Sequence, residues 1–121
     1  MNEFLEILSR EVDNSDRIYL YPEDGNWCAY EQSACRLKQL FPQCAIQQVT
    51  NHTYEVVLIR TLIHDNYPEG ELEGVLSLVP EVLIHDGYLE ILVRRQKQIL
   101  FDTWKQTELA NIVTVIEFER A

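Results

Sequence analysis

Hydrophobic and polar residues form their clearest pattern between residues 17 and 41, where the spacing changes from that of a strand to that of a helix. The β-branched and aromatic residues 17–21 predict a strand, and Pro22 followed by Glu-Asp-Gly predicts the turn that ends it. From Asn26 onward, apolar residues recur at helical spacing and predict an amphipathic helix. That helix ends at Phe41, because a residue before proline is disfavoured in the α region. Its apolar stripe comprises Tyr30, Ala34, Leu37, Leu40 and Phe41.

Three further helices are predicted from apolar spacing and end signals. Residues 2–12 form the first, with charged residues such as Glu11 placed away from its apolar face. Residues 72–79 form another, which Pro80 closes and acids in its first turn favour. Residues 102–109 form a short helix opened by Asp102. The apolar face of the first helix holds Phe4, Leu5, Leu8 and Val12.

The remaining β-rich stretches predict two hairpins and a final strand. Residues 44–49 and 54–62 flank a turn-rich linker of hairpin length. Residues 82–85 and 88–93 flank an Asp-Gly pair, which is a strong signal for a two-residue hairpin turn. Residues 112–118 are β-rich and predict the last strand.

These elements predict a single α+β domain spanning residues 1–121, with one mixed β-sheet and helices packed against it. The expected order is α-β-α-β-β-α-β-β-α-β. The strand at 54–62 is expected in the middle of the sheet, because it is apolar on both faces between Val56 and Ile59. Residues 96–104 fit both a strand and a longer helix.

The net charge and the cysteine content indicate which kinds of binding partner and which cellular compartment to expect. Twenty acidic and ten basic residues give a net charge of −10, which repels a phosphate backbone and favours a basic partner or simple solubility. The unpaired cysteines Cys28, Cys35 and Cys44 suggest neither a disulfide framework nor a zinc site, so we expect buried thiols and a cytoplasmic location. The acidic N-terminus and the lack of a long apolar run predict no signal peptide and no membrane association.

The only grouping that suggests a metal or acid–base site is a pair of His-Asp dipeptides, His64-Asp65 and His85-Asp86. Both pairs lie at the ends of predicted strands and are interpreted as turn residues, and His52 lies in a predicted turn as well. No nucleophile elbow and no phosphate-binding glycine loop accompanies them. We therefore expect no catalytic residues, no metal and no cofactor.

Aromatic and basic residues supply the candidate binding positions. Tyr21, Trp27 and Tyr30, with Tyr19, gather around one strand and turn, where rings can anchor a partner or pack in the core. Arg94, Arg95 and Lys97 form the only basic cluster and either contact phosphate or end a strand in solvent.

The first half of the chain resembles the N-terminal domain of MutS mismatch-repair proteins, in a diverged form that small stand-alone bacterial proteins share. The resemblance rests on residues 18–21 as the strand, Gly25-Asn26-Trp27 as the turn, and residues 29–40 as the helix. In that family the turn carries a Phe-x-Glu pair that wedges into a mismatched step and contacts the base. Here Trp27 stands at the aromatic position and Ala29 at the acidic one, so the resemblance implies the fold more than mismatch recognition.

The sequence thus leads to two functional hypotheses. The first is a small acidic, non-catalytic accessory or regulatory protein that acts through protein–protein interaction, with a basic partner favoured. The alternative is a diverged nucleic-acid-binding module for mismatched or single-stranded DNA. Whether the free edge of the sheet pairs with a second copy is left open. Trp27 distinguishes a structural ring from an exposed binding anchor. Truncation of Trp27 to alanine should lower the folding stability by on the order of 3 kcal/mol if the ring packs in the core. The loss should be under about 1 kcal/mol if the ring is an exposed anchor for a partner.

Overall fold

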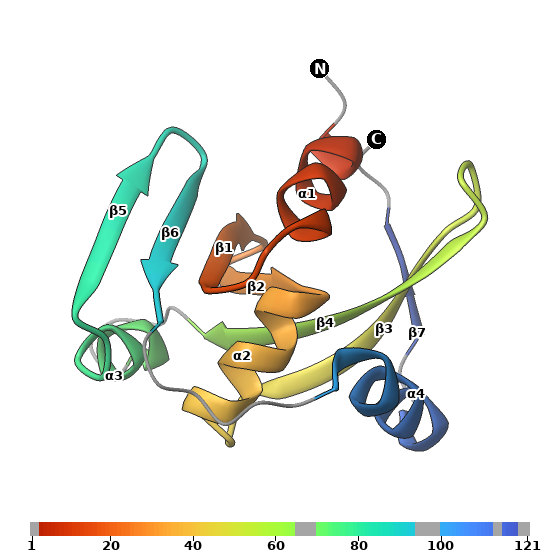
Figure 1. The fold of residues 1–121 in the computed structure, drawn as a ribbon. Helices are drawn as coiled ribbons and strands as arrows, with labels where there is room; N and C mark the ends of the chain where they lie inside the picture. Colours follow the sequence, from red (N-terminus) through yellow and green to blue (C-terminus); the bar gives the residue numbers. More distant parts are fainter. Residues whose placement is uncertain (1–2, 65–69, 94–99, 113–114, 119–121) are drawn as a thin grey trace.

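The computed structural model describes residues 3–64, 70–93, 100–112 and 115–118, which form a seven-stranded mixed sheet and four helices (Figure 1). The predicted α+β class with one mixed sheet is confirmed. The helices are α1 (Glu3–Val12), α2 (Gln32–Leu40), α3 (Glu71–Leu76) and α4 (Phe101–Asn111). The strands are β1 (Arg17–Glu23), β2 (Asn26–Tyr30), β3 (Ala45–Asn51), β4 (Val56–His64), β5 (Glu81–His85), β6 (Tyr88–Leu92) and β7 (Val115–Glu117).

The sheet order is β5-β6-β1-β2-β4-β3-β7. Neighbouring strands run antiparallel except β3 and β7, which pair in parallel. The predicted interior position of β4 is confirmed, because β2 pairs with one of its edges and β3 with the other. Both predicted hairpins are present as β3–β4 and β5–β6. Within the described part of the chain, no helix is long and apolar enough to cross a bilayer.

Strand β2 is the main departure from the sequence prediction, which began a helix at Asn26. Asp24 and Gly25 have φ angles of 50° and 80°, as a tight two-residue hairpin turn requires, and they lead β1 directly back into β2. The backbone of β2 then pairs with β1 on one side and with β4 on the other. Because these two ladders satisfy its hydrogen-bonding groups, the segment is extended, and α2 begins only at Gln32. Helix α2 ends before Pro42, as predicted.

Two clusters of buried side chains occupy opposite faces of the sheet, since neighbouring residues on a strand belong to different clusters. Helix α1 contributes to the first cluster and helices α2 and α3 to the second. The first cluster contains Phe4, Ile7, Tyr21, Cys28, Tyr30, Val49, Leu58, Leu62 and Phe118. The second contains Ile18, Leu20, Ala29, Leu37, Cys44, Ile63, Val75, Leu89 and Ile91.

The predicted apolar face of α1 is wrong in part. The helix buries Phe4, Ile7 and Glu11, whereas Leu5 and Val12 are 45% and 77% exposed. The helix is therefore rotated from the predicted orientation, toward a face that carries a carboxylate. This orientation is stable because polar groups of the fold donate hydrogen bonds to the Glu11 carboxylate, as described below.

The C-terminal elements are close to the predicted ones. Helix α4 begins at Phe101 rather than at Asp102, which lies in its first turn, and Leu100 occupies the N-cap position. The described part of the last strand, β7, is shorter than predicted. After it, Phe118 is buried against Phe4 and Tyr30, with ring centroids 5.1 and 6.1 Å away. Residues 96–99 of the ambiguous segment lie outside the described residues.

Candidate functional site

The structure places two of the predicted binding residues in the core. Tyr21 and Tyr30 are 3% and 0% exposed, so neither ring reaches a partner without opening the first cluster. The Tyr30 hydroxyl donates to the Glu23 carboxylate and lies 3.4 Å from the Arg60 guanidinium. Arg94, Arg95 and Lys97 lie outside the described residues.

Trp27 is half-buried and packs against the second cluster. It pairs with Pro22 of β1 and Ile63 of β4. Trp27 and Tyr30 lie on opposite faces of the sheet, because alternate residues of β2 point to opposite faces and Tyr30 belongs to the first cluster. The indole therefore packs on the face of the sheet that carries the second cluster, to which α2 contributes.

The histidines of the two His-Asp pairs have partners within the fold. The Nδ1 atom of His64 lies 2.8 Å from the side-chain oxygen of Asn26. The Nε2 atom of His85 lies 2.8 Å from a Glu90 oxygen, and its ring stacks on Tyr88. Asp65 lies outside the described residues. Among the residues described, no three His, Cys, Asp or Glu side chains are grouped as a metal site would require.

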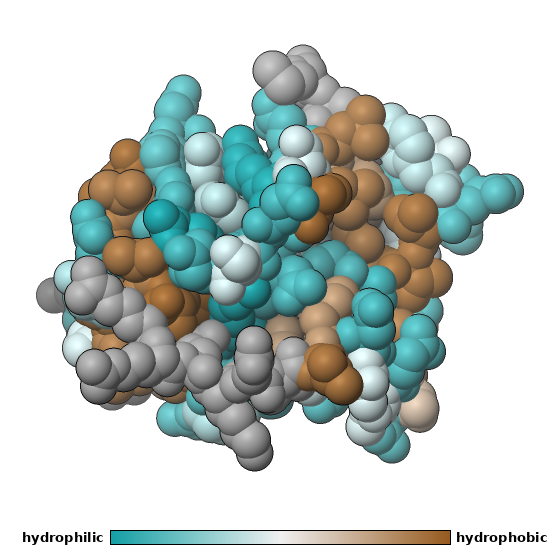
Figure 2. Space-filling model, in the orientation of Figure 1, coloured by the Kyte–Doolittle hydropathy of each residue, from teal (hydrophilic) through white to brown (hydrophobic). Residues whose placement is uncertain are grey.

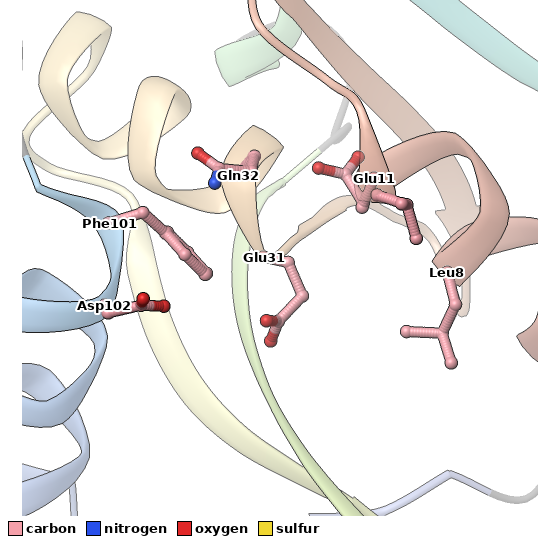
Figure 3. A pocket seen from close by; sticks show the side chains of 7 residues that line it. Leu8, Glu11, Glu31, Gln32, Phe101 and Asp102 are labelled. Atoms are coloured by element: carbon pink, nitrogen blue, oxygen red, sulfur yellow. The ribbon is translucent and has the colours of Figure 1, made fainter.

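A pocket of about 270 Å³ lies where α1, the start of α2 and the start of α4 meet (Figure 3). In Figure 3 the carboxylates of Glu31 and Asp102 face the same opening, and the Phe101 ring points toward it from the side. Its walls combine carboxylates with apolar groups from three separate segments of the chain. The lining residues are Leu8, Glu11, Val12, Glu31, Gln32, Phe101 and Asp102.

Glu31 connects three elements at the floor of this pocket. Its φ of 53° reverses the chain between β2 and α2. Its backbone N–H donates to the Ile59 carbonyl and its carboxylate accepts from the Ile59 N–H, both at 2.9 Å. The other carboxylate oxygen accepts from Lys105 of α4, also at 2.9 Å. The side chain is only 13% exposed, so the pair with Lys105 is shielded from solvent.

Glu11 forms the wall on the α1 side and is 5% exposed. Its carboxylate accepts from the Ser33 N–H at 2.9 Å, the Ser33 hydroxyl at 2.5 Å and the Asn14 amide at 3.1 Å. Burial raises the pKa of Glu11 to about 7, while these donors and the nearby Arg36 oppose the rise. The Ser33 hydroxyl also accepts from Asn14 and from the Tyr19 N–H. This network ties α1 to β1 and α2.

The pocket carries an excess of negative charge at its opening, since Glu31 and Asp102 outnumber the one described cation paired there, Lys105. Leu8, Val12 and Phe101 supply apolar surface beside these acids. An elongated cation with an aliphatic stem matches this combination.

The sequence analysis did not predict the pocket, because it placed Glu11 away from the apolar face of the first helix. Helical spacing allowed either face of α1 to be buried. Glu31 has a positive φ, but it is not a glycine, so the sequence gives no sign of this backbone conformation. Only contacts between residues far apart in the chain bring these acids together.

The fold and the pocket define an α+β domain with an acidic, partly apolar pocket. A comparison of the chain with protein-family models, curated proteins and solved structures finds no match. The resemblance to the MutS N-terminal domain therefore stays a prediction.

Proposed function

We propose that this chain is a non-catalytic accessory protein that acts through protein–protein interaction, and that its pocket receives a lysine or arginine side chain of a basic partner. The observation that carries the proposal is the pocket itself, in which the carboxylates of Glu31, at the junction of β2 and α2, and of Asp102 in α4 lie beside apolar surface. The net charge of −10 acts in the same direction, because it attracts a basic protein at long range.

The dimensions of the pocket favour a side chain over a whole small molecule. Its volume of about 270 Å³ is below the roughly 300–1,000 Å³ of common small-molecule sites. The Phe101 ring already has the Lys105 ammonium 6.0 Å from its centroid, so it presents a face that attracts cations. A second ammonium or guanidinium would lie between Asp102 and Glu31.

The fold holds the carboxylates in place, and each Glu31 oxygen accepts one hydrogen bond and keeps a second acceptor position for a cation. Both oxygens of Glu11 and both oxygens of Glu31 accept hydrogen bonds from the fold. The pocket walls described contain no serine, cysteine or histidine that would act as nucleophile or base. The nucleic-acid alternative is disfavoured, because carboxylates around the opening repel phosphate.

The test measures binding of a pentalysine peptide through tryptophan fluorescence, since Trp104 lies 6.1 Å from the Phe101 ring. Asp102→Asn removes a pocket charge, and Glu73→Gln is the matched control. Both residues are exposed acids in the first turn of a helix, but Glu73 belongs to α3, away from the pocket. We expect Asp102→Asn to weaken binding about threefold, as loss of one partly exposed charge pair does. Glu73→Gln should leave binding unchanged.

Equal weakening by the two variants would show that pentalysine responds to net charge alone and would refute the pocket as the binding site. A pentaglutamate peptide controls for peptide effects on fluorescence. Tighter binding of an oligothymidine than of pentalysine, with the steep salt dependence of phosphate contacts, would instead favour the nucleic-acid alternative.

A further inference from the structure

Strand β5 forms one edge of the sheet, and among the described residues no element pairs with its outer side (Figure 1). The strand comprises five residues, Glu81–His85, and pairs with β6 through all of them. An edge strand presents unpaired backbone donors and acceptors to solvent and is therefore a template for another strand.

The side chains of this edge are unusually apolar for an exposed position. Leu83 is 45% exposed and Ile84 is 83% exposed. Leu78, between α3 and β5, is 55% exposed. Figure 2 shows apolar surface at the left-hand side of the molecule, over β5 and α3. Burial of such side chains is the main favourable term in association.

We propose that β5 pairs antiparallel with β5 of a second copy, with Leu83 on the two-fold axis, so that the two sheets join into one. This interface does not involve the pocket and does not depend on the proposed function. The partner is a second copy because the sequence of β5 complements itself in this arrangement.

The register follows from symmetry. A two-fold axis perpendicular to the sheet keeps each face on its own side, and opposite residues of an antiparallel pair share a face. The axis must therefore pass through a residue position. Only when that residue is Leu83 do all five residues of β5 face residues of β5. A shift of the axis to Val82 or Ile84 leaves residues at the ends of the strand facing turns.

The side chains match in this register. Val82 faces Ile84 of the second copy, and Leu83 faces its own counterpart, so three apolar pairs form across the axis. Glu81 faces His85 of the second copy at each end, which sets a carboxylate against an imidazole. Apolar cross-strand pairs stabilise a sheet, whereas like charges facing each other destabilise it, and this register sets no two like charges opposite each other. Every position of β5 thus faces a compatible one.

The oligomeric state is measured by analytical ultracentrifugation over a range of protein concentrations. Wild-type protein should form a dimer. Leu83→Lys places two ammonium groups against each other on the axis and should weaken dimerisation at least tenfold. Val115→Lys is the control, because Val115 is 56% exposed on β7, the edge strand at the other end of the sheet. A monomeric wild-type protein, or equal weakening by both variants, would overturn the proposal.

The register is tested separately with single cysteines at the edge, since the three natural cysteines are buried. Leu83→Cys places two thiols directly opposite, about 4.5–5.5 Å apart at Cβ, which is near disulfide geometry. Ile84→Cys places a more exposed thiol diagonally across, at roughly 7–8 Å. Under mild oxidation, Leu83→Cys should give a cross-linked dimer much faster than Ile84→Cys. Faster cross-linking of Ile84→Cys would refute the Leu83-centred register.

Discussion

The buried carboxylate of Glu11 makes a specific prediction about stability and pH. Its pKa rises from an ordinary 4.5 to about 7, chiefly through burial. A rise of this size corresponds to about 3 kcal/mol, at about 1.4 kcal/mol for each pKa unit. Because the folded protein holds this proton more tightly than the unfolded chain, the free energy of unfolding should fall as pH rises between 4.5 and 7.

The perturbation is Glu11→Gln, which removes the titrating group and keeps the shape of the side chain. The assay is urea unfolding at several pH values from 5.5 to 8, which avoids the low solubility expected near the pI of 4.6. The difference in unfolding free energy, wild type minus Glu11→Gln, cancels the titration of every other group. We expect that difference to fall by about 2 kcal/mol over this range, because part of the effect lies below pH 5.5.

Glu11→Gln also has a cost that does not depend on pH. The Ser33 hydroxyl, which donates to Glu11, already accepts from Asn14 and Tyr19, so an amide there leaves a buried donor without an acceptor. This cost, about 1 kcal/mol, shifts the difference curve without changing its slope. A flat curve would refute the raised pKa. A difference that rises with pH would show that the hydrogen bonds outweigh burial. Glu6→Gln, on the same helix outside the network, is the control.

Three further predictions concern the turn, the core edge and the thiols. Gly87→Ala should lower the unfolding free energy measured in urea by about 1–2 kcal/mol, because Gly87 has a φ of 90°. Gly74→Ala in α3, where an added Cβ meets no close contact, should be neutral or stabilising, and an equal effect of the two substitutions would contradict the prediction. Trp27→Ala should lower the unfolding free energy by about 2 kcal/mol, less than a fully buried ring, and an unchanged melting curve would show that the indole does not pack. Burial raises the pKa of the Cys44 thiol to about 11, so it should react with a disulfide reagent at pH 8 only after unfolding, and rapid labelling of the native protein would argue against this burial.

The elements that were predicted correctly have local signals. Asp86 and Gly87 set the β5–β6 turn through backbone preference, and Pro42 ends α2 by its effect on the residue before it. The interior position of β4 followed from its apolar character on both faces. Such signals act within a few residues, so one sequence is enough to read them.

The elements that were predicted wrongly depend on distant partners. The short apolar run of β2 fits a strand and a helix alike, and the flanking strands β1 and β4 decide between them. The face of α1 depends on Ser33 and Asn14, which supply the donors that make burial of Glu11 tolerable.

Composition and short-range backbone preference were enough to predict the α+β class, the negative charge, the burial of the three cysteines and most turns, because both act along the chain. Two features could not be predicted in this way: Glu11, Glu31 and Asp102 line one pocket, and β5 lies at an edge of the described sheet with apolar side chains exposed. The surroundings of a side chain are set by strand order and helix packing, which join residues that no periodicity along the chain connects.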